Sequence, residues 1–130
     1  MIIDSSALVA MLLREDDHLA LTHAMNNADS RKISAATLLE TNIVVDRRTD
    51  HETREQFATY LDEAFTEVVP FNAEQAAIAR RAYERFGKGS GHRAGLNFGD
   101  CFAYALAKET GEPLLFKGDD FSHTDIVPAL

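Results

Sequence analysis

Short apolar runs alternate with longer mixed stretches along the 130 residues of the chain. Most of the short runs are apolar throughout, which is typical of strands that are buried on both faces of a parallel sheet. The longer stretches begin near residues that cap helices, such as Ser5, Ser6, Ser34 and Asn72. The pattern predicts strands at residues 2–3, 32–33, 68–70, 114–116 and 125–127.

Six helices are expected between these strands. Gly111 and Pro113 end the last helix, because glycine adopts the left-handed terminal conformation and proline prevents the helix from resuming. Residues 87–97 contain four glycines, which predicts a flexible loop. This alternation predicts one α/β domain over residues 1–130 with a central parallel sheet. The helices should cover residues 5–13, 16–26, 34–45, 52–65, 72–86 and 98–109.

Acidic side chains follow the predicted strands, where a parallel α/β fold places its functional site. Asp4 directly follows the first strand, and Asp119 and Asp120 come shortly after the strand at 114–116. Asp100 lies in the first turn of the last helix. Each of these acids alone is also typical of a helix cap or of a partner for the helix dipole. Together they predict a cluster of carboxylates at one edge of the sheet.

Glu40 has no basic residue at the helix positions beside it. Arg47 lies on the same face two turns away, about 10 Å along the axis, and could pair with Glu40 only by bending back. A carboxylate among apolar neighbours is costly to bury unless it is paired or binds a metal. An all-oxygen cluster suits Mg²⁺ or Mn²⁺, the usual equipment for phosphodiester hydrolysis. The candidate catalytic residues are Asp4, Glu40, Asp100 and Asp119.

Several other functions lack their motifs. The chain has no P-loop, no dinucleotide-binding glycine motif after a strand and no nucleophile elbow. The five histidines are scattered, and no set of His and Cys has zinc spacing. Cys101, the single cysteine, lies in an apolar run and is expected to be a small buried residue. Neither a signal peptide nor a bilayer-length apolar stretch is visible, so a cytoplasmic location is expected.

Four segments carry a resemblance to a known family. They are residues 2–8 (IIDSSAL), 34–40 (SAATLLE), 96–107 (LNFGDCFAYALA) and 114–121 (LLFKGDDF). In order and spacing they resemble the PIN-domain ribonucleases, and most closely the VapC toxins of bacterial toxin–antitoxin pairs. The resemblance covers nearly the whole chain. It implies a single PIN domain with a three-layer α/β/α fold and a parallel sheet of four to five short strands.

The resemblance also implies a function and the residues that perform it. The function is that of a Mg²⁺- or Mn²⁺-dependent endoribonuclease acting on structured RNA such as tRNA or ribosomal RNA. Asp4 and Asp100 would be the main metal ligands, and Glu40 and a fourth acid would complete the site. Both Asp119 and Asp120 are available, and Asp119 is preferred because it lies nearer the strand end. Supporting polar residues would be Ser5, Ser6, Asn97 and Asp120.

The family further implies two kinds of protein partner. One is a cognate VapB-type antitoxin, whose C-terminal segment blocks the acidic pocket, often with a basic residue. The other is a second copy of the chain in a homodimer, so that toxin and antitoxin would form a hetero-oligomer.

The chain carries 21 acidic and 13 basic residues, a formal net charge of −8, which taken alone disfavours a nucleic-acid partner. Residues 80–97, the basic island, hold five basic side chains against Glu84 alone, a net charge of +4 that leaves −12 on the remainder. That acidic remainder should attract a basic antitoxin tail. The alternative for the island is a solvated helix face with local pairs around Glu84. The candidate RNA-binding residues are Arg81, Arg85, Lys88 and Arg93.

Two other functions stay open on the sequence. A receiver-like phosphoacceptor domain also has an α/β fold, a strand-end aspartate and a lysine near its last strands, here Lys117. Such a domain normally has an acid pair before its first helix, where this chain has Asp4 followed by two serines, and it gives Glu40 no role. A non-catalytic PIN module that binds RNA or antitoxin is the second alternative, which the complete set of acids disfavours.

Overall fold

Four short strands pair in parallel in the order β3-β2-β1-β4. The structure, a computed structural model, describes residues 1–130. At the centre, Ile2 of β1 pairs with Lys32 of β2 on one side and with Leu114 of β4 on the other. The predicted parallel sheet is confirmed, but the strand expected at 125–127 is reduced to an isolated bridge between Leu114 and Pro128. The strands are β1 (Ile2–Ile3), β2 (Arg31–Ser34), β3 (Thr66–Val69) and β4 (Leu114–Leu115).

Six α-helices and one 3₁₀ helix join the strands, and none of them is long and apolar enough to cross a membrane. Ser34 and Asn72 cap helices as predicted, but Asp4, rather than Ser5 or Ser6, caps the first helix. Gly111 ends the last helix with a left-handed φ of 69°. The helices are α1 (Ser5–Leu12), α2 (His18–Asn27), α3 (Ala35–Arg48), α4 (His51–Glu63), α5 (Ala73–Phe86), α6 (Asp100–Thr110) and η1 (Phe121–His123).

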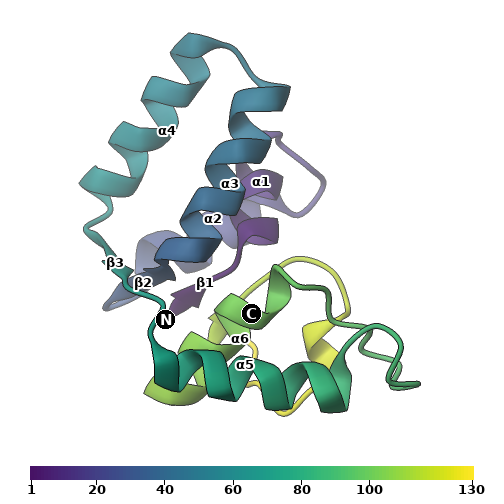
Figure 1. The fold of residues 1–130 in the computed structure, drawn as a ribbon. Helices are drawn as coiled ribbons and strands as arrows, with labels where there is room; N and C mark the ends of the chain where they lie inside the picture. Colours follow the sequence, from purple (N-terminus) through teal and green to yellow (C-terminus); the bar gives the residue numbers. More distant parts are fainter.

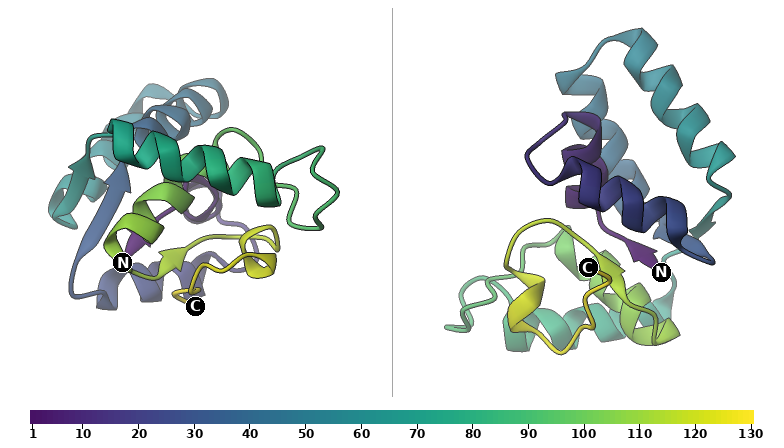
Figure 2. Two further views of the ribbon diagram at one scale, coloured as in Figure 1. Left: turned by 60° about the horizontal axis from the view of Figure 1, so that its bottom comes forward. Right: turned by 180° about the vertical axis from the view of Figure 1, so that it is seen from behind.

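The sheet separates two apolar cores. Ile2 and Leu114 belong to the core that α5 and α6 cover, whereas Ile3 and Leu115 belong to the core that α1, α2 and α3 cover. This division follows from strand geometry, in which successive side chains point to opposite faces. Figures 1 and 2 show the helices on the two sides of the sheet and the hairpin of α3 and α4 extending beyond it. The three-layer α/β/α architecture is confirmed.

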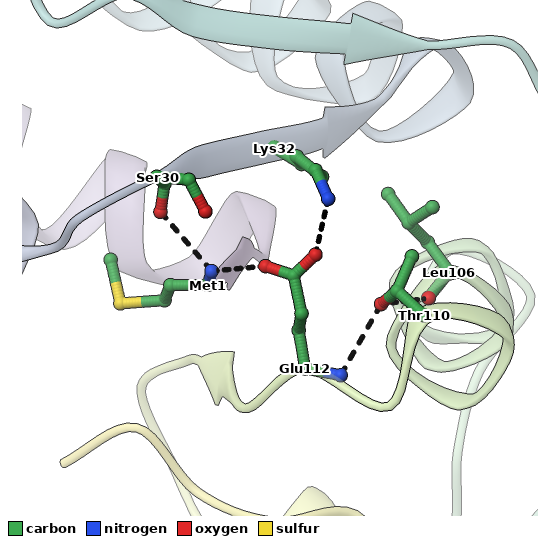
Figure 3. A network of polar contacts seen from close by, with 6 residues as sticks. All are labelled: Met1, Ser30, Lys32, Leu106, Thr110 and Glu112. Atoms are coloured by element: carbon green, nitrogen blue, oxygen red, sulfur yellow. Dashed lines mark hydrogen bonds and ion pairs between the residues drawn. The ribbon is translucent and has the colours of Figure 1, made fainter.

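Glu112 joins three segments at the amino-terminal edge of the sheet (Figure 3). Its carboxylate forms ion pairs with Lys32 of β2 and with the amine of Met1, which precedes β1. The amine also donates a hydrogen bond of 3.1 Å to the carbonyl oxygen of Ser30. The hydrogen bonds from Lys32 and from the amine hold the pKa of Glu112 below its usual range. This clamp fixes the strands at the edge opposite the candidate active site.

Candidate active site

Asp4 lies at the carboxyl end of β1, and its side chain is buried with 2% exposure. Its Oδ2 accepts hydrogen bonds from the backbone N–H and the hydroxyl of Ser6, at 3.0 and 2.6 Å. The Ser6 hydroxyl in turn accepts a bond of 3.0 Å from the backbone N–H of Lys117, just beyond β4. Ser6 therefore ties the ends of two neighbouring strands to the same carboxylate.

Burial raises the pKa of Asp4 to about 6. The two hydrogen bonds from Ser6 act in the opposite direction, because they stabilise the ionised carboxylate. The negative charges of Asp100 and Glu40 raise the pKa further, which places all three acids in one electrostatic neighbourhood. The structure thus brings together three carboxylates that lie 36 and 60 residues apart in the sequence.

Glu40 is held between the starts of two other helices. Its Oε1 accepts a hydrogen bond of 2.5 Å from the hydroxyl of Ser5, the first residue of α1. Gly99, which precedes α6, packs against the same carboxylate so closely that a Cβ atom there would lie 1.9 Å from Oε2. Glu40 forms no ion pair, so Arg47 does not bend back to neutralise it.

Asp100 is oriented by Asn97, as the sequence predicts. The backbone N–H of Asn97 donates to Oδ2 of Asp100 at 2.8 Å, and the N–H of Asp100 donates to Oδ1 of Asn97 at 2.9 Å. Partial burial raises the pKa of Asp100, and the charges of Asp120 and Glu40 add to that increase. The bond from Asn97 and the positive charge of Lys88 lower it. The pKa of Asp100 is therefore affected both by neighbouring acids and by Lys88 of the basic island.

Asp120, rather than Asp119, is the acid of its pair whose charge reaches Asp100. The side chain of Asp119 is 82% exposed and its Oδ2 lies 3.0 Å from Nε2 of His123. Gly118 adopts a φ of 97° that only glycine accepts readily, so the chain turns sharply between β4 and the two aspartates. Nearness to the strand end favours Asp119 as the fourth acid, whereas the charge that acts on Asp100 favours Asp120. The spacing of four residues between Asp119 and His123 was the available signal, since it allows a pair on one helical turn.

The basic island is only partly free to bind RNA. Arg85 lies 3.9 Å from Oδ2 of Asp125, and its guanidinium sits 4.6 Å from the centre of the Phe86 ring. These contacts stabilise the end of α5, so Arg85 has a structural role that sequence reasoning missed. Glu84 does not form the expected local pairs with Arg81 and Arg85 but pairs with Arg80, at 3.5 Å. Exposed side chains without an ion pair are those of Arg81, Lys88 and Arg93.

The donor set fits a hard divalent cation. All of the converging groups are carboxylates, and their mutual repulsion is a cost that a cation would remove. In the structure, however, no three Asp, Glu, His or Cys side chains lie close enough together to hold a metal ion. Asp4 and Asp100 are the pair that the fold fixes most firmly, through Ser6 and Asn97.

Comparisons with known proteins agree with this geometry. A family model described as the PIN domain matches residues 1–127. The chain is 50% identical over 130 residues to ribonuclease VapC28 of Mycobacterium tuberculosis, covering 100% of this chain and 98% of that protein. It is 48% identical over 126 residues to a ribonuclease VapC of Mycolicibacterium smegmatis, covering 97% of each.

Two solved structures share the fold at low sequence identity. VapC20 of Mycobacterium tuberculosis, described as a sarcin-ricin loop cleaving toxin, matches with a TM-score of 0.75 and 18% identity, covering 97% of this chain and 95% of that one. FitAcB from Neisseria gonorrhoeae matches with a TM-score of 0.72 and 17% identity, covering 98% of this chain and 96% of that one. The sheet, its acidic edge and these matches define a PIN-domain protein. Within that class, the chain belongs to the VapC ribonucleases, which excludes the receiver-like alternative.

Proposed function

We propose that this protein is the toxin of a toxin–antitoxin pair and a divalent-metal-dependent endoribonuclease that hydrolyses phosphodiester bonds in structured RNA, such as tRNA or ribosomal RNA. The observation that supports it best is that Asp4, Glu40 and Asp100 lie near enough at the carboxyl edge of the sheet for their charges to interact, with raised pKa values at both aspartates. Membership of a ribonuclease family supports the reaction class.

Asp4 and Asp100 would hold Mg²⁺, with Mn²⁺ as a substitute, and Glu40 and Asp120 would complete the acidic site. A bound ion of this kind polarises a phosphoryl oxygen and lowers the pKa of a bound water molecule. Asp120 takes the place that the sequence favoured for Asp119, because its charge acts on Asp100. The repulsion among these carboxylates predicts that the site takes up metal before substrate arrives.

The other polar residues position this machinery. Ser6 holds the carboxylate of Asp4, Asn97 orients Asp100, and Ser5 fixes Glu40. Lys88 lies near enough to influence Asp100 and is placed to attract the phosphate groups that flank the scissile bond. Arg81 and Arg93, which are exposed and form no ion pair, would add to the binding of the RNA backbone.

The antitoxin is the expected protein partner, of the VapB type. The buried acids at the sheet edge suit a basic side chain from such a partner, which would neutralise them and exclude metal and RNA together. A homodimer of the toxin is expected as well, and Leu39 and Ile43 of α3 offer exposed apolar side chains for an interface, at 61% and 43% exposure.

Cleavage assays test the proposal directly. Purified protein should cut structured RNA in Mg²⁺ or Mn²⁺, and EDTA or the substitution Asp4→Asn should abolish cutting. The exposed acid Asp29 supplies a matched control. It precedes β2 at the amino-terminal edge of the sheet, so Asp29→Asn removes one charge away from the carboxyl edge and should leave the activity unchanged. Binding of RNA without metal-dependent cleavage would instead support the non-catalytic PIN module.

A further inference from the structure

Phe98 is 78% exposed, although it stands between two residues of the candidate active site, Asn97 and Asp100. Its backbone is not free to move independently, because the reciprocal hydrogen bonds of Asn97 and Asp100 close the turn on both sides of it. The adjoining Gly99 packs against the Glu40 carboxylate. The phenyl ring is therefore presented to solvent from a fixed turn of the backbone that also carries Asp100.

Other aromatic rings support Phe98 without covering it. Phe98 meets Phe102 in a T-shaped contact with 4.9 Å between ring centres, and Phe102 meets Phe71 in the same way at 4.7 Å. Edge-to-face contacts of this kind hold a ring in place while leaving much of its surface open. The high exposure of Phe98 shows that its open surface is large.

A groove of about 550 Å³ runs between α5 and α6 from this ring. It is lined mostly by apolar side chains, including Phe71, Phe102 and Tyr83 of α5, and Arg80 lies on its wall. This volume falls within the range of pockets that bind small planar ligands. Phe98, which lines the groove, is two residues from Asp100 in the chain, and Arg80 of the basic island also lines it.

We propose that Phe98 is a stacking platform for an unpaired nucleobase of the RNA, next to the phosphodiester bond that is cut; this inference rests on the proposed function. Unpaired bases stack on exposed aromatic side chains with little dependence on sequence, whereas a base inside a duplex cannot reach such a ring. Arg80 on the wall of the groove and Arg81, which forms no ion pair, supply charge for the phosphates on either side. The enzyme therefore selects loops or single-stranded segments over continuous duplex.

A second copy of this chain is the competing occupant of the groove. The nearness of Phe98 to Asp100 in the chain and the positive charge of Arg80 favour RNA, because a phosphate-linked base suits both the aromatic and the basic parts of the surface. The two occupants differ in measurable ways, since only RNA places a nucleobase against the ring.

The test uses the full-length Asp4→Asn protein, which should bind without cutting, and RNA hairpins with 2-aminopurine at successive loop positions. Binding should quench the fluorescence at one loop position. Adding Phe98→Ala should remove the quenching and weaken binding of the hairpin about 5- to 100-fold, while leaving binding of fully duplex RNA unchanged. Phe98→Trp should retain both properties. Phe65→Ala is the matched control, because Phe65 is 88% exposed and precedes β3 at the opposite edge of the sheet.

Unchanged hairpin affinity and quenching in Phe98→Ala would overturn the inference. It would also be overturned if 2-aminopurine is quenched at no loop position while Phe98→Ala abolishes self-association in sedimentation velocity, because the groove would then belong to a second copy. Neither result affects the proposed function, which fails only if the wild-type protein shows no metal-dependent cleavage.

Discussion

The hydroxyl of Ser5 donates a hydrogen bond of 2.5 Å to Oε1 of Glu40, which lies 35 residues further along the chain. Ser5 opens α1 and Glu40 lies in the middle of α3, so this one bond connects the two helices at the acidic edge of the sheet. No other side chain donates a hydrogen bond to Glu40. Its position depends on a single hydroxyl group.

Removing that hydroxyl in Ser5→Ala should therefore release the carboxylate. A hydrogen bond to a charged group contributes about 1.5–3 kcal/mol, so cleavage should slow about tenfold or more if Glu40 acts in the site. Initial rates of RNA cleavage at saturating Mg²⁺ measure the effect. Ser5→Thr keeps the hydroxyl and should retain most of the rate, and equal rates for the alanine and wild-type proteins would show that the bond is dispensable.

The substitution Gly99→Ala should reduce cleavage while leaving the thermal stability of the protein nearly unchanged. The φ of Gly99 is −63°, which alanine accepts, so Gly99→Ala adds only the clash of its Cβ with the Glu40 carboxylate. Since that carboxylate ends a flexible side chain, it can move aside at little cost to folding. We expect a melting temperature within a few degrees of wild type but cleavage reduced at least tenfold. A large loss of thermal stability would mean that the turn itself cannot adjust.

The raised pKa of Asp4, about 6 against 3.8 in an unfolded chain, makes the metal-free protein pH-dependent. Between these values the folded state binds more protons than the unfolded state, so the free energy of unfolding should fall as the pH rises from about 4 to 6. Asp4→Asn removes this effect and should stabilise the metal-free protein at pH 7.5 by about 3 kcal/mol. Thermal unfolding in EDTA at several pH values measures the difference, which should vanish near pH 4.

Metal addition supplies the complementary measurement. Mg²⁺ or Mn²⁺ should raise the melting temperature of the wild-type protein at pH 7.5, because the ion binds only the folded state. Asp4→Asn should respond much less. An equal increase in both proteins would place the bound metal elsewhere.

The two neighbouring aspartates after β4 should behave differently. Asp120→Asn should weaken metal binding and slow cleavage by about tenfold, because the charge of Asp120 acts on Asp100. Asp119→Asn should change cleavage less than twofold, since its side chain is exposed and pairs with His123. Calorimetric titration with Mn²⁺ and cleavage rates for the two variants decide between them. The reverse order of effects would restore Asp119 as the fourth acid.

Loss of the ion pairs of Glu112 should lower the free energy of unfolding without changing the rate of cleavage. Glu112→Gln breaks the ion pairs with Lys32 and the amine of Met1, and we expect a loss of about 1 kcal/mol at pH 7. Because the pKa of Glu112 is lowered in the folded state, this contribution is present above the unfolded pKa of 4.5 and is lost as the pH falls through the folded value. Urea titrations at pH 7 and pH 3 should therefore differ in the size of the effect, while cleavage rates at pH 7 stay unchanged.

Local signals explain what could be predicted from the sequence. Ser34 and Asn72 cap helices through bonds to their own next turn, and Gly111 ends α6 through its own φ, so these boundaries were predicted. The convergence of Asp4 and Asp100 was also accessible, because parallel strands bring their carboxyl ends to one edge.

Features that depend on the path of a turn or on distant partners were not predictable in this way. The positions of Asp119 and Asp120 depend on the turn at Gly118, whose conformation no periodicity reveals. Arg85 appeared free for RNA because Asp125, its partner, is 40 residues away in the sequence. No local pattern in the sequence points to the ion pairs of Glu112, because they join three segments that are far apart in the chain.

The bond from Lys117 to Ser6 spans 111 residues, and β1 gains its second neighbour only when β4 pairs with it. Asp100 and Asp120 likewise come from the last third of the chain. A ribosome that adds about 5–20 residues per second exposes the first aspartate several seconds before the others exist. The acids proposed to hold the metal therefore cannot come together until synthesis of the chain is almost finished, and we expect nuclease activity to appear only then.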